Sequence, residues 1–385
     1  MNILYLSQLG GGHDSYVRRI ANELIRLGNT VTILYIEYGN KKITIASENG
    51  LTIVSVGLLG LHYYASKLLS NCTEVVRYCR SIEYQWQLTK TIKMLNKIFR
   101  YDLVECHEVE VYASVRRLLP VIIRMHSLDW VWKENADDSG YQASRSEAVT
   151  QRRLVLNAEA VFSPSRSLID IVEKKCKVNR EITVIPYPVD TDVFYPVDKA
   201  SDELIILFVG RVEYRKGADC IISAMQIIWS QFPEAILKLV GSVDASMKTM
   251  LKTIGDNRIK VVGRVRLEML PEIYRKASIV VVPSRWDNSP NVIYEAMASG
   301  VPVVGSKVGG IPELINDGVD GLLFQRSNVQ ELAGKILYLL SNRDVSRSIG
   351  NKARERMLQT CKLEIISRKT QKHYLDIIQS WKIKK

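Results

Sequence analysis

The sequence lacks any hydrophobic run long enough to cross a membrane. A spanning helix needs about 20 consecutive apolar residues, whereas the longest apolar stretches of this chain have the length of β-strands. The first residues, MNILYLSQLGGG, have no basic region and no adequate apolar segment, so we expect a first β-strand there rather than a secretory signal. These absences predict a cytoplasmic protein.

Cysteine and histidine are also scarce, which argues against metal and disulfide sites. The 6 cysteines include no CxxC pair, and none of them belongs to a cluster with the 5 histidines. We therefore expect reduced thiols and no bound metal. The cysteines are Cys72, Cys79, Cys106, Cys176, Cys220 and Cys361.

A third absence concerns nucleic acid. The net charge of +12 favours an anionic partner. The basic residues, however, are spread over both halves of the chain and form no nucleic-acid-binding motif. We therefore expect no nucleic-acid partner, and the charge alone does not say which anion the protein binds.

The chain has the length and the apolar content for two domains. A chain of 385 residues is too long to fold around a single compact core. Its content of 46% hydrophobic and 24% charged residues is that of an ordinary globular protein. Apolar runs alternate with helical patterns in both halves, which predicts an α/β fold with two doubly wound domains facing a central cleft. Because Pro186-Tyr187-Pro188 breaks the pattern, we divide the chain into residues 1–188 and 189–364.

A glycine-rich turn, Gly10-Gly11-Gly12, opens the first βαβ unit. It lies in an expected loop from Leu9 to Ser15, before an expected helix from Tyr16 to Leu27. Such a turn lets backbone N–H groups approach a diphosphate, but it is equally typical of a tight strand-to-helix connection. A dinucleotide cofactor is a weaker interpretation: Glu37 could bind a ribose, but Ser15 occupies the place of the third glycine.

Two histidines stand where expected strands end. His107 follows the expected strand Asp102–Cys106, and His126 follows the expected strand Val121–Met125. In a parallel sheet both would face the crevice edge where open α/β sheets bind ligands. Either histidine could simply end a strand, and we regard His126 as the stronger candidate for function.

A long, mostly helical region from Ser66 to Phe99 combines basic and aromatic residues. The basic residues are Lys67, Arg77, Arg80, Lys90, Lys93, Lys97 and Arg100, and the aromatic residues in and beside the region are Tyr63, Tyr64, Tyr78, Tyr84 and Trp86. Such a surface can dock on the anionic inner face of a membrane. We favour a solvated helix with its aromatic residues in the core, and keep a peripheral membrane contact through residues 67–100 as the second interpretation.

Charged residues gather in two loops of the second half. Gly210-Arg211 and Lys216-Gly217 follow an expected strand, and two cations there could hold a diphosphate. Asp287 follows a later strand, and Glu295 lies in the next helix with seven residues between the two acids. Carboxylates accept hydrogen bonds from the vicinal hydroxyls of a sugar or ribose. The two loops therefore predict a ligand site at the carboxyl ends of the strands.

The residues from Asp287 to Glu313 read DNSPNVIYEAMASGVPVVGSKVGGIPE. This stretch resembles the acid-x7-acid signature of family 4 retaining glycosyltransferases, which have the GT-B fold of two Rossmann-like domains. Arg211 and Lys216 resemble that family's diphosphate-binding pair. The N-terminal glycine turn, His126-Ser127, Phe162-Ser163-Pro164-Ser165 and Ile185 to Phe194 also fit the family in the right order, so the resemblance covers nearly the whole chain.

The resemblance implies a hexosyltransferase that needs neither metal nor cofactor. It would move a sugar, with retention of configuration, from a nucleotide-diphospho-sugar to a hydroxyl of a glycan, lipid-linked or small-molecule acceptor in polysaccharide or glycoconjugate synthesis. It also implies that the last helix, about 365–385, packs back on the N-terminal domain. The rival interpretations are a nucleotide-sugar 2-epimerase of the same fold, a non-catalytic nucleotide-sugar or glycan-binding protein, and a nicotinamide oxidoreductase, which Ser15 disfavours.

The same resemblance assigns the site residues. The catalytic candidates are His126, Arg211, Lys216 and Asp287, and the donor-binding candidates are Gly11, Gly12, Arg211, Lys216, Gly263, Arg264, Asp287, Asn288, Ser289, Pro290, Asn291, Val292 and Glu295. The two cations would stabilise the departing diphosphate, Glu295 would hold the ribose, and Asp287 and His126 would contact the donor sugar. One departure matters: the family usually has glutamate where this chain has Asp287, whose side chain is one methylene shorter.

Overall fold

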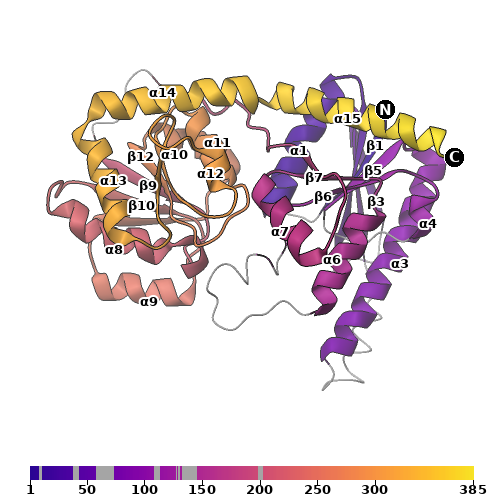
Figure 1. The fold of residues 1–385 in the computed structure, drawn as a ribbon, viewed down its shortest axis with the longest axis horizontal. Helices are drawn as coiled ribbons and strands as arrows, with labels where there is room; N and C mark the ends of the chain where they lie inside the picture. The colour runs from indigo at the N-terminus through magenta and orange to yellow at the C-terminus, as the bar shows by residue number, and fades with distance from the viewer. Residues whose placement is uncertain are drawn as a thin grey trace.

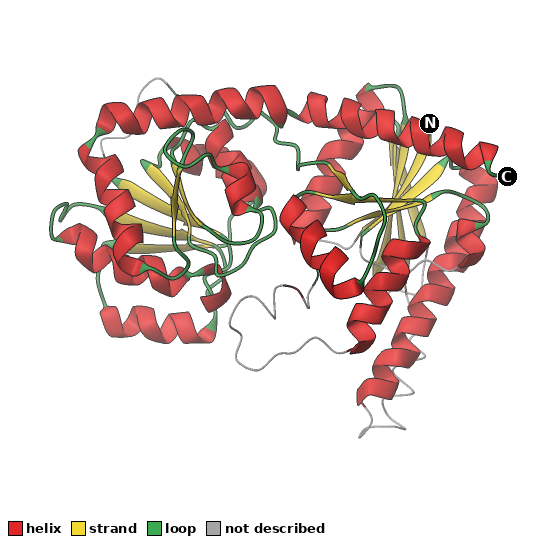
Figure 2. Cartoon of the chain, viewed as in Figure 1, coloured by secondary structure: helices red, strands yellow, loops and turns green. Residues whose placement is uncertain are grey.

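The computed structural model contains two β-sheets that lie side by side, each with its own helices (Figure 1). It describes residues 1–7, 11–37, 43–57, 73–107, 113–126, 128, 131, 145–197 and 203–385. Helices cover both faces of each sheet (Figure 2). The two layers of helices around each sheet confirm the predicted α/β, doubly wound architecture.

The N-terminal sheet has 8 strands and is parallel except at one edge. In sheet order the strands are β3 (Thr44–Glu48), β4 (Leu51–Gly57), β2 (Thr30–Glu37), β1 (Asn2–Ser7), β5 (Leu103–Cys106), β6 (Val121–Arg124), β7 (Ala160–Ser163) and β8 (Thr183–Val184). The antiparallel edge strand β3 was not predicted, because all of its residues are exposed and it contains no apolar run. The signal for it is the Asn49-Gly50 pair, which has positive φ at both residues and is typical of a hairpin turn.

The C-terminal sheet has 6 strands, and all of its pairs are parallel. In sheet order the strands are β11 (Ile259–Gly263), β10 (Ile236–Val240), β9 (Ile205–Val209), β12 (Ile279–Val282), β13 (Val303–Ser306) and β14 (Leu322–Phe324). Strand β14 was not predicted, since three residues are too few to show a period. The first strand, β9, lies in the middle of the sheet beside β12, and the loops after these two strands therefore meet.

Some of the helices begin at residues whose side chains accept from free backbone N–H groups. The helices are α1 (Gly11–Arg26), α3 (Thr73–Phe99), α4 (Ala113–Arg116), α6 (Arg145–Asn157), α7 (Arg166–Cys176), α8 (Ala218–Trp229), α9 (Ala245–Ile254), α10 (Leu270–Arg275), α11 (Asn291–Ala298), α12 (Ile311–Leu314), α13 (Val329–Ser341), α14 (Arg343–Thr360) and α15 (Leu363–Ile383), with short 3-10 turns η1 (Tyr214–Lys216) and η2 (Leu267–Met269). Helix α7, for example, is capped by the Ser165 hydroxyl, which accepts from the Leu168 N–H.

The prediction of a loop from Leu9 to Ser15 is wrong from Gly11 onward. Helix α1 already begins at Gly11, where Asp14 places an acid in the first turn.

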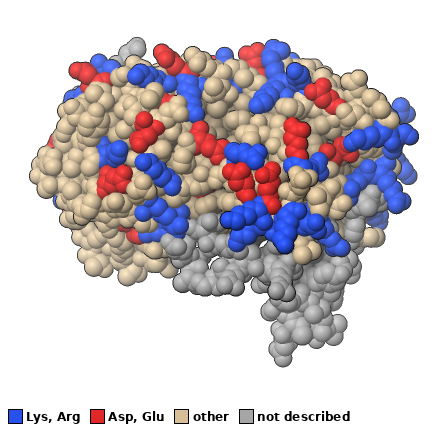
Figure 3. Space-filling model, viewed as in Figure 1, with Lys and Arg blue, Asp and Glu red and all other residues tan. Residues whose placement is uncertain are grey.

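The last two helices return along the molecule to the N-terminal domain (Figure 1). Helix α15 packs on α1, and its Tyr374 is fully buried against the N-terminal sheet. The Tyr374 hydroxyl lies 2.7 Å from that of Tyr5 and donates to a Glu105 carboxylate oxygen at 2.6 Å. Lys and Arg side chains gather at the end of the molecule where the C-terminus lies (Figure 3).

An ion pair lies inside the core that α15 covers. The Arg124 guanidinium donates to Glu105 at 2.8 and 3.3 Å, and both side chains are almost fully buried. Its central carbon also lies 4.8 Å from the Tyr16 ring centroid and 5.0 Å from that of Phe162. Because Arg124 ends strand β6, this pair fixes the sheet directly before His126.

The two connections between the domains pair with each other. The Val189 N–H donates to the Cys361 carbonyl at 2.9 Å, and the Leu363 N–H donates to the Val189 carbonyl at 3.0 Å. Arg354 on α14 donates to the carbonyls of Ala298 at 2.6 Å and Thr191 at 3.0 Å, which ties the first connection to the C-terminal domain.

In the described part of the chain, no helix combines the length and the apolar character needed to span a membrane.

Candidate active site

The loops after β9 and β12 are packed together at the carboxyl ends of the strands. Gly217 has φ of +71°, and a Cβ atom there would lie 1.9 Å from the Pro283 carbonyl oxygen. Only glycine permits both the backbone conformation and the close approach. The same junction is held by Arg285, whose backbone N–H donates to the Arg215 carbonyl at 3.0 Å.

The Arg285 side chain joins these loops more firmly, and the sequence analysis missed it. Its guanidinium binds both Asp219 carboxylate oxygens at 2.7 Å and lies 3.4 Å from the centroid of the Tyr214 ring. Asp219 is in the first turn of α8, where the helix dipole favours an acid. An arginine next to the Asp287 loop could have suggested such a pair, but its partner lies in a distant part of the sequence.

Lys216 and Asp287 are brought together at this junction. The Lys216 ammonium lies 2.5 Å from an Asp287 carboxylate oxygen, and the Ser284 hydroxyl donates to the same oxygen at 3.2 Å. The short acid therefore reaches the cation of the neighbouring loop. Arg211 does not share this contact: its side chain is 60% exposed and pairs with Glu213 at 3.3 Å.

Glu295 lies on α11, deeper in the molecule and next to the other domain. Its carboxylate accepts from the Tyr274 hydroxyl at 3.0 Å and lies 3.7 Å from the Arg19 guanidinium of helix α1. Burial raises the pKa of this carboxyl, while Arg19 and the Tyr274 hydroxyl act in the opposite direction. A buried acid at the contact between the two domains can accept hydrogen bonds from hydroxyl groups there.

The Gly309-Gly310 turn packs against the backbone of the Asp287 loop. A Cβ atom at Gly309 would lie 2.0 Å from the Asp287 carbonyl oxygen, and one at Gly310 would lie 1.9 Å from that of Asn288. The Gly310 N–H also donates to the Asp287 carbonyl at 3.1 Å. The two glycines are therefore needed for packing, which explains why the turn follows the acidic motif in this sequence.

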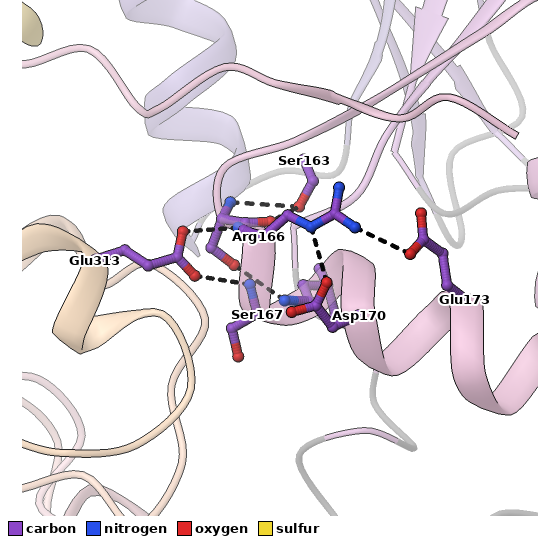
Figure 4. Close-up of polar contacts among 8 residues, drawn as sticks. Ser163, Arg166, Ser167, Asp170, Glu173 and Glu313 are labelled. Atoms are coloured by element: carbon purple, nitrogen blue, oxygen red, sulfur yellow. Dashed lines mark hydrogen bonds and ion pairs between the residues drawn. The ribbon is translucent and has the colours of Figure 1, made fainter.

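The Asp287 loop reaches across to the N-terminal domain. The Asn288 amide donates to the His126 carbonyl at 2.6 Å, and its oxygen is hydrogen-bonded to the Ser165 hydroxyl. Glu313 makes a second bridge, because its carboxylate accepts from the backbone N–H groups of Arg166 and Ser167, both at 2.7 Å (Figure 4). The C-terminal domain thus clasps the start of α7, where the helix dipole favours a negative charge.

His126 follows β6 at the edge of this interface. Its Nδ1 atom lies 2.5 Å from the Tyr187 hydroxyl oxygen, and the two rings are nearly parallel with centroids 5.4 Å apart. Tyr16 lies edge-on to the His126 ring at 5.3 Å. His107, by contrast, has its Nδ1 atom 3.3 Å from the Leu6 carbonyl oxygen, and burial lowers its pKa.

The other predicted residues lie at or near the ends of strands and helices. Gly11 and Gly12 form the first turn of α1, and Gly263 ends β11 with φ of +81°, followed by the exposed Arg264. The Ser289 hydroxyl lies 2.7 Å from that of Tyr294, Pro290 is the N-cap of α11, and Asn291 and Val292 begin that helix. The predictions for Gly10, Ser127 and residues 133–144 fall outside the described residues. Among the described residues, no group of three or more His, Cys, Asp or Glu side chains could hold a metal.

Comparison with known proteins agrees with this geometry. The family described as "Glycosyltransferase Family 4" matches residues 10–193, and the family described as "Glycosyl transferases group 1" matches residues 191–356. An uncharacterized glycosyltransferase of Methanocaldococcus jannaschii is 27% identical over 300 residues, which are 76% of this chain and 80% of that protein. A D-inositol 3-phosphate glycosyltransferase of Segniliparus rotundus is 31% identical over 279 residues, 66% of this chain and 62% of that protein.

Solved structures share the fold over nearly the whole chain. Sucrose-phosphate synthase from Thermosynechococcus elongatus superposes with a TM-score of 0.83 at 22% identity, covering 99% of this chain and 100% of that chain. HepE of Anabaena, solved in complex with UDP, superposes with a TM-score of 0.70 at 18% identity, covering 98% and 100%. The fold and the site therefore define a glycosyltransferase with the GT-B fold. The chain belongs to glycosyltransferase family 4, which confirms the resemblance seen in the sequence.

Proposed function

We propose that this glycosyltransferase is a retaining, metal-independent hexosyltransferase that uses a nucleotide-diphospho-sugar. The observation that carries the proposal is the Lys216–Asp287 pair, with the buried Glu295 on the helix that follows. This arrangement supplies one cation for a diphosphate and two carboxylates for sugar and ribose hydroxyls. HepE, which has the same fold, is solved with UDP and with UDP-glucose, and this supports a nucleotide-sugar donor.

The proposed reaction places the departing diphosphate against Lys216 and the first turn of α11. The backbone N–H groups of that turn and the ammonium would stabilise the charge that develops as the bond between the sugar C1 and the phosphate oxygen breaks. Asp287, released from Lys216, would accept from the sugar hydroxyls. The acceptor oxygen would bond to C1 on the face that the phosphate leaves, and its proton would pass to the departing phosphate oxygen.

The acceptor would be a hydroxyl of a glycan, a lipid-linked sugar or a small molecule, in polysaccharide or glycoconjugate synthesis. One relative reported above is named a D-inositol 3-phosphate glycosyltransferase, and this supports a small polyol as one possible class of acceptor. Alternatives of the same fold, a nucleotide-sugar 2-epimerase or a non-catalytic sugar-binding protein, receive no support from the relatives, which are named as transferases.

A donor panel tests the proposal. Thermal shift and hydrolysis would be measured with UDP-, GDP- and ADP-sugars, with and without a chelator, and the anomeric configuration of the product would be determined by NMR. We expect one nucleotide class to raise Tm by mass action, chelator-resistant turnover and a product with the donor's configuration. Inversion, or loss of activity with chelator, would contradict the corresponding part of the proposal.

We also propose that helix α3 carries a peripheral membrane contact. Its exposed residues Trp86, Lys90, Met94, Lys97 and Ile98 are spaced three to four residues apart or adjacent and so lie on one side of the helix. The Lys90 ammonium lies 5.2 Å from the Trp86 ring centroid. Apolar and basic side chains on one exposed stripe suit an anionic bilayer. Flotation with anionic and with neutral liposomes tests this, and we expect the protein to float only with the anionic ones. Equal recovery of the protein with both kinds of liposome would contradict the proposal.

A further inference from the structure

His126 is held at two points by residues that do not belong to its own strand. The Tyr187 hydroxyl lies 2.5 Å from the ring atom Nδ1, and the Asn288 amide donates to the backbone carbonyl at 2.6 Å. One contact fixes the imidazole and the other fixes the backbone that carries it. Together they define where the opposite ring atom, Nε2, lies.

Both partners connect His126 to the loop that carries Asp287 and to the helix that carries Glu295. Tyr187 is buried on the connection between the domains, between Pro186 and Pro188, and its ring lies 6.3 Å from that of Tyr294. Tyr294 directly precedes Glu295 on α11, and Asn288 directly follows Asp287. The flanking prolines restrict the backbone of the connection, so Tyr187 is presented on a stiff segment.

The chemistry of the Tyr187 contact determines the state of the imidazole. A phenolic hydroxyl carries its proton at neutral pH and can donate it in a hydrogen bond. When it donates to Nδ1, the proton of the neutral imidazole lies on Nε2, since only one nitrogen of that form is protonated. Nε2 is then a hydrogen-bond donor toward a sugar hydroxyl and not an acceptor.

We propose that Tyr187 and Asn288 are positioning residues that present the Nε2–H of His126 to the donor sugar when the domains are closed. This inference rests on the proposed function, because the donor sugar is its ligand. Correct placement of His126 would then depend on the same loop that carries Asp287.

The decisive measurement is the tautomer of His126. Long-range 1H–15N spectra of the full-length protein, labelled on histidine and assigned with His126→Gln, report which ring nitrogen carries the proton. We expect the Nε2–H form in the wild type and in Asn288→Ala, and a mixture of both forms in Tyr187→Phe. A wild type that already shows the Nδ1–H form, or a mixture, would overturn the proposal.

Kinetics separate positioning from simple structural support. Tyr187→Phe keeps the ring and removes one hydrogen bond, so we expect kcat to fall up to about tenfold with little change in donor KM. In a His126→Ala background the same substitution should have no further effect. Tyr101→Phe, which removes a buried phenolic hydroxyl just before strand β5 in the same domain, is the matched control and should leave kcat unchanged.

The two readouts also separate this inference from the proposed function. Equal losses from Tyr187→Phe with and without the imidazole would show that Tyr187 acts on the fold alone, and this would overturn the inference. The tautomer is measured without turnover, so it tests the inference even if the wild type transferred no sugar from any nucleotide-sugar in the panel. That second result would contradict the proposed function instead.

Discussion

The two domains build their sides of the candidate site in different ways. On the C-terminal side, Lys216, Asp287 and Glu295 come from short loops and one helix turn, and glycines allow these segments to touch. On the N-terminal side, His126 takes its place from β6, from the connection between the domains and from a loop of the other domain. The C-terminal side is therefore assembled from short motifs within one domain, whereas the N-terminal side takes its geometry from segments of both domains. The predictions below are ordered by expected effect and probe this contrast.

The largest effect should follow from breaking the buried ion pair behind His126. Arg124→Met leaves the Glu105 carboxylate buried without its partner, which costs about 3–5 kcal/mol of stability. Chemical denaturation measures this loss. Arg124→Met combined with Glu105→Leu should recover most of the stability, because an apolar pair replaces the charges. If the single variant were as stable as the wild type, the core would not hold the N-terminal side as we describe.

On the C-terminal side, where we propose that the donor binds, the expected loss is in turnover and not in stability. Lys216→Ala removes the cation expected at the leaving diphosphate, so we expect transfer to fall about 10²–10³-fold while Tm changes little. Steady-state kinetics with the donor identified in the panel measures this. Lys248→Ala, an exposed lysine on α9, is the matched control. A loss of only a few-fold would contradict the diphosphate assignment of Lys216.

The contrast explains which parts of the molecule could be predicted. Apart from β3 and β14, the strands of both sheets have clear apolar runs, helices α13 to α15 have apolar periods, and the residues from Asp287 to Glu313 keep their motif in one segment. Arg285 and Tyr187 could not be placed in this way, because their partners Asp219 and His126 lie 66 and 61 residues away. Partner choice over such distances depends on the tertiary fold, for which a single sequence carries no local signal.

Glu295 provides a test in which stability and donor binding change in opposite directions. The pKa of Glu295 is raised, so the folded state favours the protonated acid. The contribution of Glu295 to the free energy of unfolding therefore decreases as pH rises from the ordinary glutamate pKa of about 4.3 through the raised pKa. Glu295→Gln should therefore be more stable than the wild type at neutral pH, with the difference shrinking toward low pH. Tm measured across this range checks the sign. Donor affinity should fall about tenfold, because a carboxylate binds hydroxyls more strongly than an amide does.

The smallest effect should come from the clasp at helix α7, which joins the two sides without contacting the reaction. Glu313→Ala removes two hydrogen bonds and a negative charge at the N-terminus of α7. We expect this to make the free energy of domain closure less favourable by about 1 kcal/mol. The closed fraction can be measured by energy transfer between a dye on each domain, and donor KM should rise a few-fold. Asp170→Ala is the matched control, since Asp170 binds the Arg166 side chain at 2.8 Å without leaving the N-terminal domain. Equal effects of the two variants would mean that Glu313 only supports α7. A larger effect of Glu313→Ala would mean that the C-terminal domain positions the N-terminal side of the site through this contact.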